Sequence, residues 1–412
     1  MKKELEKLVN SKRSVIVSGN TLSGKTAGVM FPVVDEIIKK GESLFVIDSR
    51  QEYLYKYNED LKNNGYKVVV INFSDPRYGD GWNPYTYIKD LYSNDNKDKA
   101  LALLDLLHSR IFINKNAVDP FWDNTAADLC SASALSLIKY ASDEEVNINS
   151  VSNIVTSCST KLKSSTFGVE YFKSFTDEDI CGYSNAVVNA PIETRGGIIS
   201  VASQKLRLYA SREYLSRLLN KSTFRYDELS EKIAIFVELP KQETYMSSLA
   251  LMLLEQLLHY IDDNNVNKIN IILDNYDLLD NDHNLYNLLS FNNPNKSKLY
   301  VITRSINSIK EKTNEHYETL TTIVRVKEEK IEFSYSDDET ISVDKTSIDE
   351  IEDKNIELKD ICSDDIVVFK VEDYIYKNNL APSDVADLIA RIDKKLEELE
   401  KEEKQYENKE EA

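Results

Sequence analysis

The chain has 412 residues, a hydrophobic fraction of 42%, a charged fraction of 29% and a formal net charge of -19 at pH 7. Its length predicts two or three domains, and its composition, with 11 glycines and 8 prolines, excludes a disordered or collagen-like chain. The 70 acidic against 51 basic side chains argue against an outer surface that binds nucleic acid, although net charge does not exclude a basic channel inside an oligomer.

The first informative segment is a β-branched run at residues 14–17, followed by a glycine-rich motif and a helical pattern at residues 27–38. The motif reads G-x-x-x-x-G-K-T and consists of Gly19, Asn20, Thr21, Leu22, Ser23, Gly24, Lys25 and Thr26. Strand, motif and helix in this order predict a phosphate-binding loop, because the glycines let backbone amides point at phosphate oxygens beside the helix N-terminus. We expect Lys25 to reach the β- and γ-phosphates of ATP and Thr26 to bind Mg2+.

A second strand is expected to supply the other magnesium ligand. The apolar run at residues 270–273 ends in Asp274, which we expect to share the metal with Thr26. Hydrolysing proteins of this architecture usually carry a glutamate after that aspartate, which orients the attacking water. This chain has Asn275, and an amide cannot take a proton from water. Asn275 therefore marks a degenerate catalytic position, for which Asp277 is a less favoured substitute.

Strand-like and helix-like stretches alternate around these two segments. Further strands are expected at residues 43–48, 66–71, 232–239, 298–303, 323–326 and 330–343, and helices at residues 51–63 and 247–260. Strands separated by helices of this length are typical of a parallel, doubly wound sheet, and the last two strands are expected near its edge. From residue 88 onward a helical period with little strand signal predicts an inserted all-α domain.

These patterns predict an α/β fold with a mostly parallel twisted sheet and an inserted all-α domain. The expected nucleotide-binding domain has two parts, residues 1–87 and 191–345, and the all-α insertion comprises residues 88–190. Residues 346–412 are expected to form an acidic extension that ends in a charged helix.

Several other features have structural explanations in the sequence. The aromatic pair Phe121 and Trp122 is expected in a core, with a partner contact as the alternative. Residues 193–197 are expected as a loop entering a helix, with Arg195 solvated or salt-bridged rather than bound to a phosphate. The cysteines and histidines have no metal-ligand spacing, so the only metal expected is the one that accompanies a nucleotide.

The order of these segments resembles the conjugative coupling proteins of type IV secretion, the VirD4/TraG family. The resemblance spans residues 13–330 and rests on the glycine-rich motif, on Asn83-Pro84 and on residues 119–126, which read D-P-F-W-D-N-T-A. It also rests on residues 45–52, which read F-V-I-D-S-R-Q-E where the family tends to read D-P-K-G-E, and on Leu273-Asp274.

The resemblance implies a RecA-like P-loop motor domain that works as a hexameric ring, of one or of two kinds of subunit. It implies DNA passing through a central pore, and a relaxase and secretion-channel components as partners. It also places Asn275 at the family's Walker B glutamate, Arg304 at a glutamine that senses the γ-phosphate, and Asn293 near an arginine that reaches a neighbour's nucleotide. These three departures leave ATP hydrolysis open.

The N-terminus is charged and is followed by no apolar core of a secretory signal, and no apolar run approaches the ~18 residues of a membrane span. We therefore expect a cytoplasmic protein that reaches the inner face of the cell membrane through its partners. Three functions stay open: an ATP-hydrolysing coupling protein, a hydrolysis-deficient nucleotide-binding adaptor in a mixed ring, and a P-loop ATPase of plasmid or phage maintenance unrelated to conjugation.

Overall fold

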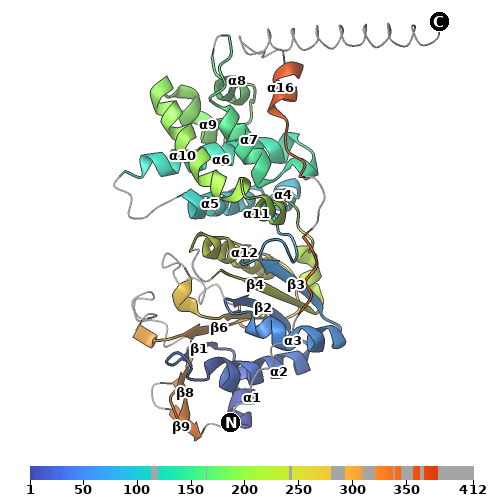
Figure 1. Ribbon diagram of the computed structural model, residues 1–412, viewed down its shortest axis with the longest axis vertical. Helices are drawn as coiled ribbons and strands as arrows, with labels where there is room; N and C mark the ends of the chain where they lie inside the picture. Colours follow the sequence, from blue (N-terminus) through green and yellow to red (C-terminus); the bar gives the residue numbers. More distant parts are fainter. Residues whose placement is uncertain are drawn as a thin grey trace, which may run out of the picture. The chain divides into compact units, whose positions relative to one another are not determined.

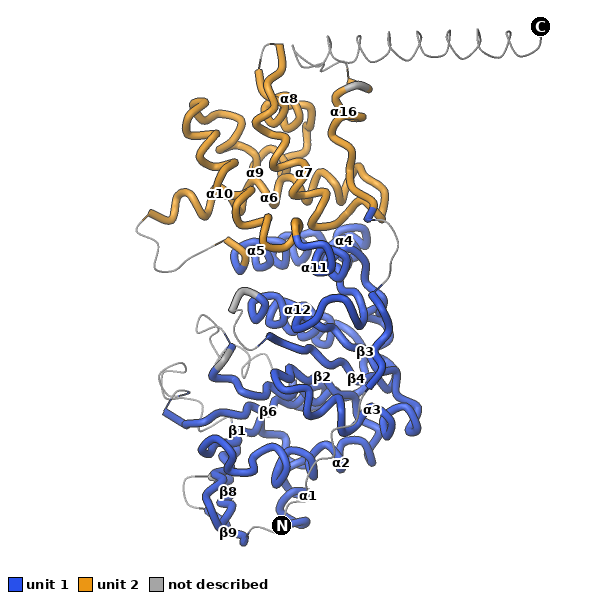
Figure 2. Tube along the Cα trace, viewed as in Figure 1, with its two compact units in different colours: residues 1–110, 212–366 blue, residues 111–211, 367–412 orange. Residues whose placement is uncertain are grey.

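The computed structural model divides the chain into two compact units, residues 1–110 with 212–366 and residues 111–211 with 367–412 (Figure 2). The C-terminal helix that the sequence predicts from residue 383 onward lies outside the residues that the structure describes. The same holds for Cys362, one of the cysteines for which no metal-ligand spacing was found. The structure describes residues 1–112, 119–163, 165–240, 244–279, 293–307, 309, 321–336, 339–344, 356–361 and 366–378.

Among the described residues of the first unit, nine strands form one sheet in the order β3-β4-β2-β5-β6-β1-β7-β8-β9. All pairs from β3 to β7 are parallel, and β8 and β9 are added antiparallel at the edge. The mostly parallel α/β fold expected from the sequence is confirmed. The strands are β1 (Ser14–Ser18), β2 (Ser43–Asp48), β3 (Lys67–Asn72), β4 (Ile233–Glu238), β5 (Ile269–Leu273), β6 (Ser297–Thr303), β7 (Thr321–Val326), β8 (Lys330–Ser336) and β9 (Glu339–Asp344).

Helices cover both faces of this sheet, which is why β1, β2, β4, β5 and β6 are buried along their whole length. Helices α1 (Lys2–Asn10), α2 (Phe31–Lys40) and α3 (Glu52–Asn63) pack their apolar side chains into one core with one face of the sheet. Helix α12 (Thr244–Asp263) lies on the other side of the strands in Figure 1. Further helical segments among the described residues of this unit are η1 (Thr26–Met30), α4 (Thr86–Ser93), α11 (Glu213–Leu218), η3 (Tyr226–Ser230) and η4 (Tyr276–Leu278).

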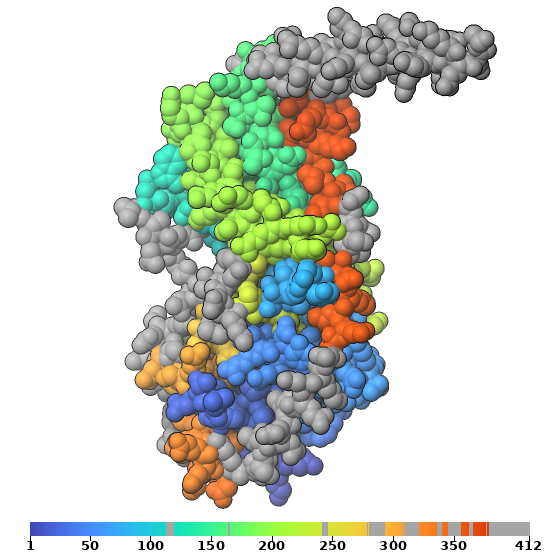
Figure 3. All heavy atoms as spheres, in the orientation of Figure 1, coloured from blue at the N-terminus to red at the C-terminus, as the bar shows by residue number. Residues whose placement is uncertain are grey.

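The first helix is fastened to the antiparallel edge of the sheet through Tyr335 on β8. The hydroxyl of Tyr335 donates to the Glu4 carboxylate at 2.8 Å, and the ammonium of Lys7 lies 3.7 Å from the centre of its ring. Figure 3 shows the first residues of the chain, in dark blue, beside the orange surface of β8 and β9. The edge strands that the sequence predicts near residue 330 thus hold the N-terminal segment.

The described residues of the second unit are mostly helical and contain one isolated β-bridge, between Lys161 and Thr166. The sequence assigns α4 and α5 to the insertion and α10 to the nucleotide-binding domain, whereas α4 and most of α5 fall in the first compact unit and α10 in the second. Periodicity gives a helix its apolar face but does not say which unit the face packs against. The helices are α5 (Lys97–Phe112), which begins in the first unit, α6 (Phe121–Tyr140), η2 (Asp143–Glu145), α7 (Ile148–Ser157), α8 (Phe167–Lys173), α9 (Glu178–Asn189), α10 (Ile192–Ala210) and α16 (Val371–Lys377).

Two expectations for this unit are wrong. Residues 193–197 belong to α10 rather than to a loop, and Arg195 donates to the carbonyl oxygens of Val187 at 2.7 Å and Ala190 at 2.8 Å, so it caps the end of α9. Phe121 and Trp122 are 44% and 37% exposed and therefore do not form a core pair. No helix in the described parts of the chain is long and apolar enough to cross a membrane.

Candidate functional site

The glycine-rich motif forms the turn between β1 and η1, and its two outer glycines are required for different reasons. Gly24 has a φ of 82°, a left-handed conformation that glycine adopts without steric cost. At Gly19 a Cβ atom would lie 2.5 Å from the carbonyl oxygen of Val326, so the close approach of β7 excludes a side chain. Leu22, at the exposed tip of the turn, also has a left-handed φ, of 62°, which is strained for a branched side chain.

Lys25 folds back over this turn. Its ammonium donates to the carbonyl oxygens of Gly19 at 2.6 Å and Asn20 at 2.8 Å. Partial burial lowers the pKa of Lys25, and the nearby Asp274 carboxylate opposes that shift. A cation is therefore held at the mouth of the loop by two backbone oxygens, from which an anionic ligand could withdraw it.

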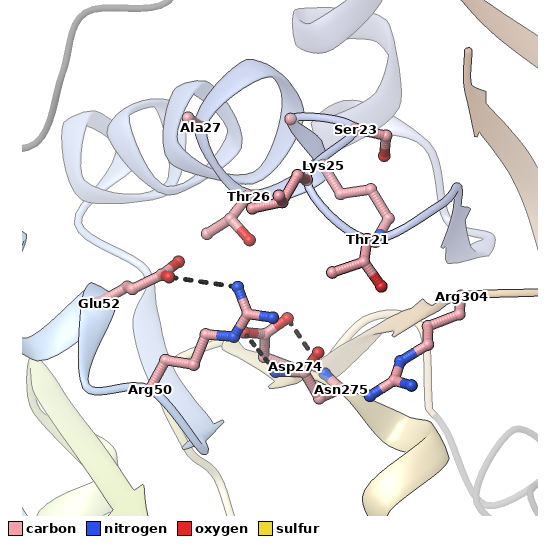
Figure 4. Close-up of a pocket in the computed structure, with 12 residues that line it drawn as sticks. Thr21, Ser23, Lys25, Thr26, Ala27, Arg50, Glu52, Asp274, Asn275 and Arg304 are labelled. Atoms are coloured by element: carbon pink, nitrogen blue, oxygen red, sulfur yellow. Dashed lines mark hydrogen bonds and ion pairs between the residues drawn. The ribbon is translucent and has the colours of Figure 1, made fainter. Parts of the chain in front are cut away.

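A cavity of about 230 Å3 opens between the turn and the carboxyl ends of β2, β5 and β6 (Figure 4). The structure brings together six of the eight motif residues with Asp274, Asn275 and Arg304, whereas Gly19 and Asn20 take part through the carbonyl oxygens that hold Lys25. The cavity is lined by Thr21, Leu22, Ser23, Gly24, Lys25, Thr26, Ala27, Arg50, Glu52, Asp274, Asn275 and Arg304.

Arg50 and Glu52 line this cavity but were not predicted as site residues. They follow β2, which pairs in parallel with β5 so that Ile47 lies beside Leu273. The carboxyl ends of parallel strands meet at one edge of a sheet, so the segment after Asp48 reaches the same place as Asp274. The position of Arg50 and Glu52 directly after a predicted strand was the available signal, and the missing information was that β2 neighbours β5.

Three buried carboxyl groups end three neighbouring strands at this edge: Glu238 on β4, Asp48 on β2 and Asp274 after β5. Burial, reinforced by Asp48 and Glu52, raises the pKa of Asp274 to about 7. Burial also raises the pKa of Asp48 to about 6, although this carboxylate accepts from the amides of Arg50 at 3.0 Å and Tyr53 at 2.8 Å. Crowded acids with raised pKa values are stabilised by an added cation, so their chemistry fits a divalent metal.

The described residues contain no group of three acidic, histidine or cysteine side chains that could hold a metal ion without other ligands. A magnesium ion bound with a nucleotide does not need such a group, because phosphate oxygens and water complete its coordination. Thr26 and Asp274 both line the cavity and provide the hydroxyl and carboxylate oxygens that the sequence predicts for this metal.

The residues after β5 and β6 are held by side-chain hydrogen bonds. Asn275 has a left-handed φ of 53°, and its Nδ2 donates to the Ser49 hydroxyl at 2.8 Å. The carboxylate of Asp277 accepts from the Thr303 hydroxyl at 2.7 Å and from the Arg304 amide at 2.6 Å. Asp277 therefore fixes the end of β6 and the start of Arg304, and it does not line the cavity.

Asn293, near which the resemblance places an arginine, lies before β6 and outside the cavity lining. Its carbonyl oxygen accepts from the amides of Lys296 at 2.9 Å and Ser297 at 2.8 Å, so it forms the turn that enters the strand.

Comparisons with known proteins agree with this fold. Structures of the plasmid coupling protein TrwB are similar: the complex with ADP and Mg2+ (TM-score 0.59, 10% identity, 85% of this chain and 89% of that chain) and the complex with the ATP analogue ADPNP (TM-score 0.60, 10% identity, 85% and 88%). TrwBΔN70 with sulphate is similar too (TM-score 0.58, 11% identity, 85% and 89%). At these identities the likeness establishes a shared fold.

No curated protein matches the chain. Residues 5–342 match the family described as Type IV secretory system Conjugative DNA transfer. This match covers well over half of the chain and agrees with the resemblance found in its motifs. The protein therefore belongs to the conjugative coupling protein family of type IV secretion systems.

Proposed function

We propose that this protein binds ATP with Mg2+ in the cavity beside β1 and β5, and that it links DNA or a relaxase to the transfer channel in conjugation. The observation that carries the proposal is the placement of a complete phosphate-binding loop opposite Asp274 at the carboxyl edge of a parallel sheet. The TrwB structures with ADP and Mg2+ and with ADPNP support the same ligands for this fold.

The cavity assigns a role to each group. Lys25 would leave the carbonyl oxygens of Gly19 and Asn20 and bind the β- and γ-phosphates, and Arg304, which also lines the cavity, would add a second positive charge for the phosphates. Thr26 and Asp274 would hold the magnesium, which neutralises phosphate charge when bound. Binding requires that Asp274 be ionised, because its proton competes for the same oxygens.

The family assignment supports action in conjugative DNA transfer and gives no support to a plasmid- or phage-maintenance ATPase unrelated to it. A ring of six subunits around DNA, with a relaxase and the secretion channel as partners, belongs to the proposal. The second candidate function is an adaptor that binds nucleotide without hydrolysing it, in a ring with an active paralogue. The amide at Asn275, where a base is expected, favours that candidate.

Isothermal titration calorimetry with ATP and Mg2+ tests the binding step. We expect saturable heat with the wild-type protein and binding at least about tenfold weaker in Lys25→Ala, because a charged contact to phosphate is lost. Lys39→Ala is the matched control, because this lysine lies on α2, its side chain is 63% exposed and it does not line the cavity. Absence of heat with the wild-type protein, or equal affinities in the wild type and Lys25→Ala, would refute the proposal.

A further inference from the structure

The degenerate position at Asn275 leaves open which group could accept a proton from an attacking water. The lining of the cavity contains two carboxyl groups among its described residues, Asp274 and Glu52. Asp274 is committed to the metal in the proposed function. Glu52 is the carboxyl group that remains.

The fold holds Glu52 in place through the turn that follows β2. The Asp48 carboxylate accepts from the amides of Arg50 and Tyr53, and Gln51 has a left-handed φ of 62°. This turn starts α3 with Glu52 as its first residue, so the backbone of Glu52 is fixed by a buried hydrogen-bond network. The side chain points into the cavity toward Arg50, on the side where Thr26 lies (Figure 4).

The carboxylate of Glu52 is paired with Arg50 and is still partly accessible in the cavity. Arg50 lies 3.5 Å from it, and the Glu52 side chain is 27% exposed, whereas Asp48 is fully buried with its oxygens bound to amides. Arg50 also acts on Asp274, where it opposes the rise in pKa caused by burial. The guanidinium of Arg50 thus offsets negative charge on both Glu52 and Asp274, and the exposed part of Glu52 can be reached by water and by a ligand.

We propose that Glu52 is the general base for ATP hydrolysis in this protein, in place of the glutamate missing at Asn275. This inference rests on the proposed function. The water oxygen bonds to the γ-phosphorus while the bond from that phosphorus to the β–γ bridging oxygen breaks. Glu52 takes the proton of the water, the electron pair of the broken bond stays on ADP, and the proton then leaves Glu52 for solvent. Lys25 and Arg304 stabilise the negative charge on the phosphates.

Steady-state release of inorganic phosphate from ATP tests this role. We expect Glu52→Gln to lose about 100-fold or more in kcat while its affinity for ATP with Mg2+ stays within about threefold of wild type. Glu59→Gln is the matched control, because Glu59 is exposed on the same helix and does not line the cavity. We expect wild-type turnover in that variant.

A second measurement separates a base from a merely structural carboxylate. In Glu52→Ala, added formate should restore phosphate release by about tenfold or more, because a small carboxylate can occupy the vacated space and accept the proton. Wild-type turnover in Glu52→Gln, no response of Glu52→Ala to formate, or an ATP-binding wild type without turnover would each overturn the assignment. A wild type that does not bind ATP would instead refute the proposed function.

Discussion

Asp274→Asn should stabilise the ligand-free protein while it removes metal-dependent nucleotide binding. Asp274 is 3% exposed, and burial of its carboxyl group beside Asp48 and Glu52 raises its pKa from 3.8 to about 7. Between these two values the folded protein holds a proton that the unfolded chain has released. The free energy of unfolding therefore falls as the pH rises through this window, and the deficit is complete above pH 7.

The magnitude follows from the pKa shift. A rise from 3.8 to about 7 corresponds to about 4 kcal/mol of lost stability at pH 8, at 1.36 kcal/mol per pKa unit. By the same relation the loss of stability is about 2 kcal/mol at pH 5, where Asp274 is mostly protonated in the folded protein. An amide has nearly the shape of the carboxyl group without its charge, so Asp274→Asn should regain these amounts relative to wild type.

Urea unfolding at pH 8 and pH 5, with EDTA and without nucleotide, measures the difference. The chain has two tryptophans, and Trp82 is fully buried in the first unit, so its fluorescence in a Trp122→Phe background reports on that unit. Asp60→Asn, at an exposed position on α3, should change nothing. The electrostatic reasoning would be contradicted if Asp274→Asn did not raise the free energy of unfolding at pH 8, or if it raised it equally at both pH values. Added ATP and Mg2+ should reverse the order, because they stabilise only the wild type.

Three further measurements test the geometry. ATP binding with Mg2+ should strengthen about tenfold between pH 6 and pH 8, as Asp274 loses its proton near pH 7, which calorimetry at both pH values would show. Gly19→Ala should cost about 1–3 kcal/mol in urea unfolding and abolish ATP binding, because its Cβ would lie 2.5 Å from a backbone oxygen at the end of β7. A Cβ atom at Gly196 would have no atom within 4 Å, so Gly196→Ala should add up to about 1 kcal/mol of stability. A Cβ atom at the neighbouring Gly197 would lie 2.6 Å from the Trp122 ring, so Gly197→Ala should destabilise the helical unit. Unfolding followed by fluorescence distinguishes the two variants.

The parts of the structure that the sequence predicts well are formed by residues that follow one another in the chain. The strand expected at residues 43–48 is β2, because a strand buried on both faces reads as one apolar run between polar turns. The glycine-rich turn is equally local, since the spacing of its residues alone predicts the turn between β1 and η1. Asp274 could be added because it directly follows another strongly apolar run, the one that forms β5.

Strand order accounts for what the sequence did not predict. Arg50 and Glu52 enter the cavity because β2 pairs with β5, more than 200 residues further along the chain, and apolar periodicity does not specify which strands are neighbours. The assignment of α10 failed for a related reason. Its paired glycines indicated a loop, but Gly197 is helical so that the Trp122 ring can pack against the helix.

The conformation of Asn275 gives a physical reason why the proposed base, Glu52, follows β2 and does not follow β5. Its φ of 53° is tolerated by asparagine better than by glutamate, for which a left-handed backbone costs roughly 1–2 kcal/mol. Its amide donates to the Ser49 hydroxyl and so ties the end of β5 to the turn that carries Arg50 and Glu52. A glutamate there would add a charge beside Asp274, whose pKa is already raised, and would lose the donor that braces this turn. The amide at position 275 thus supports the segment from which Glu52 reaches the cavity.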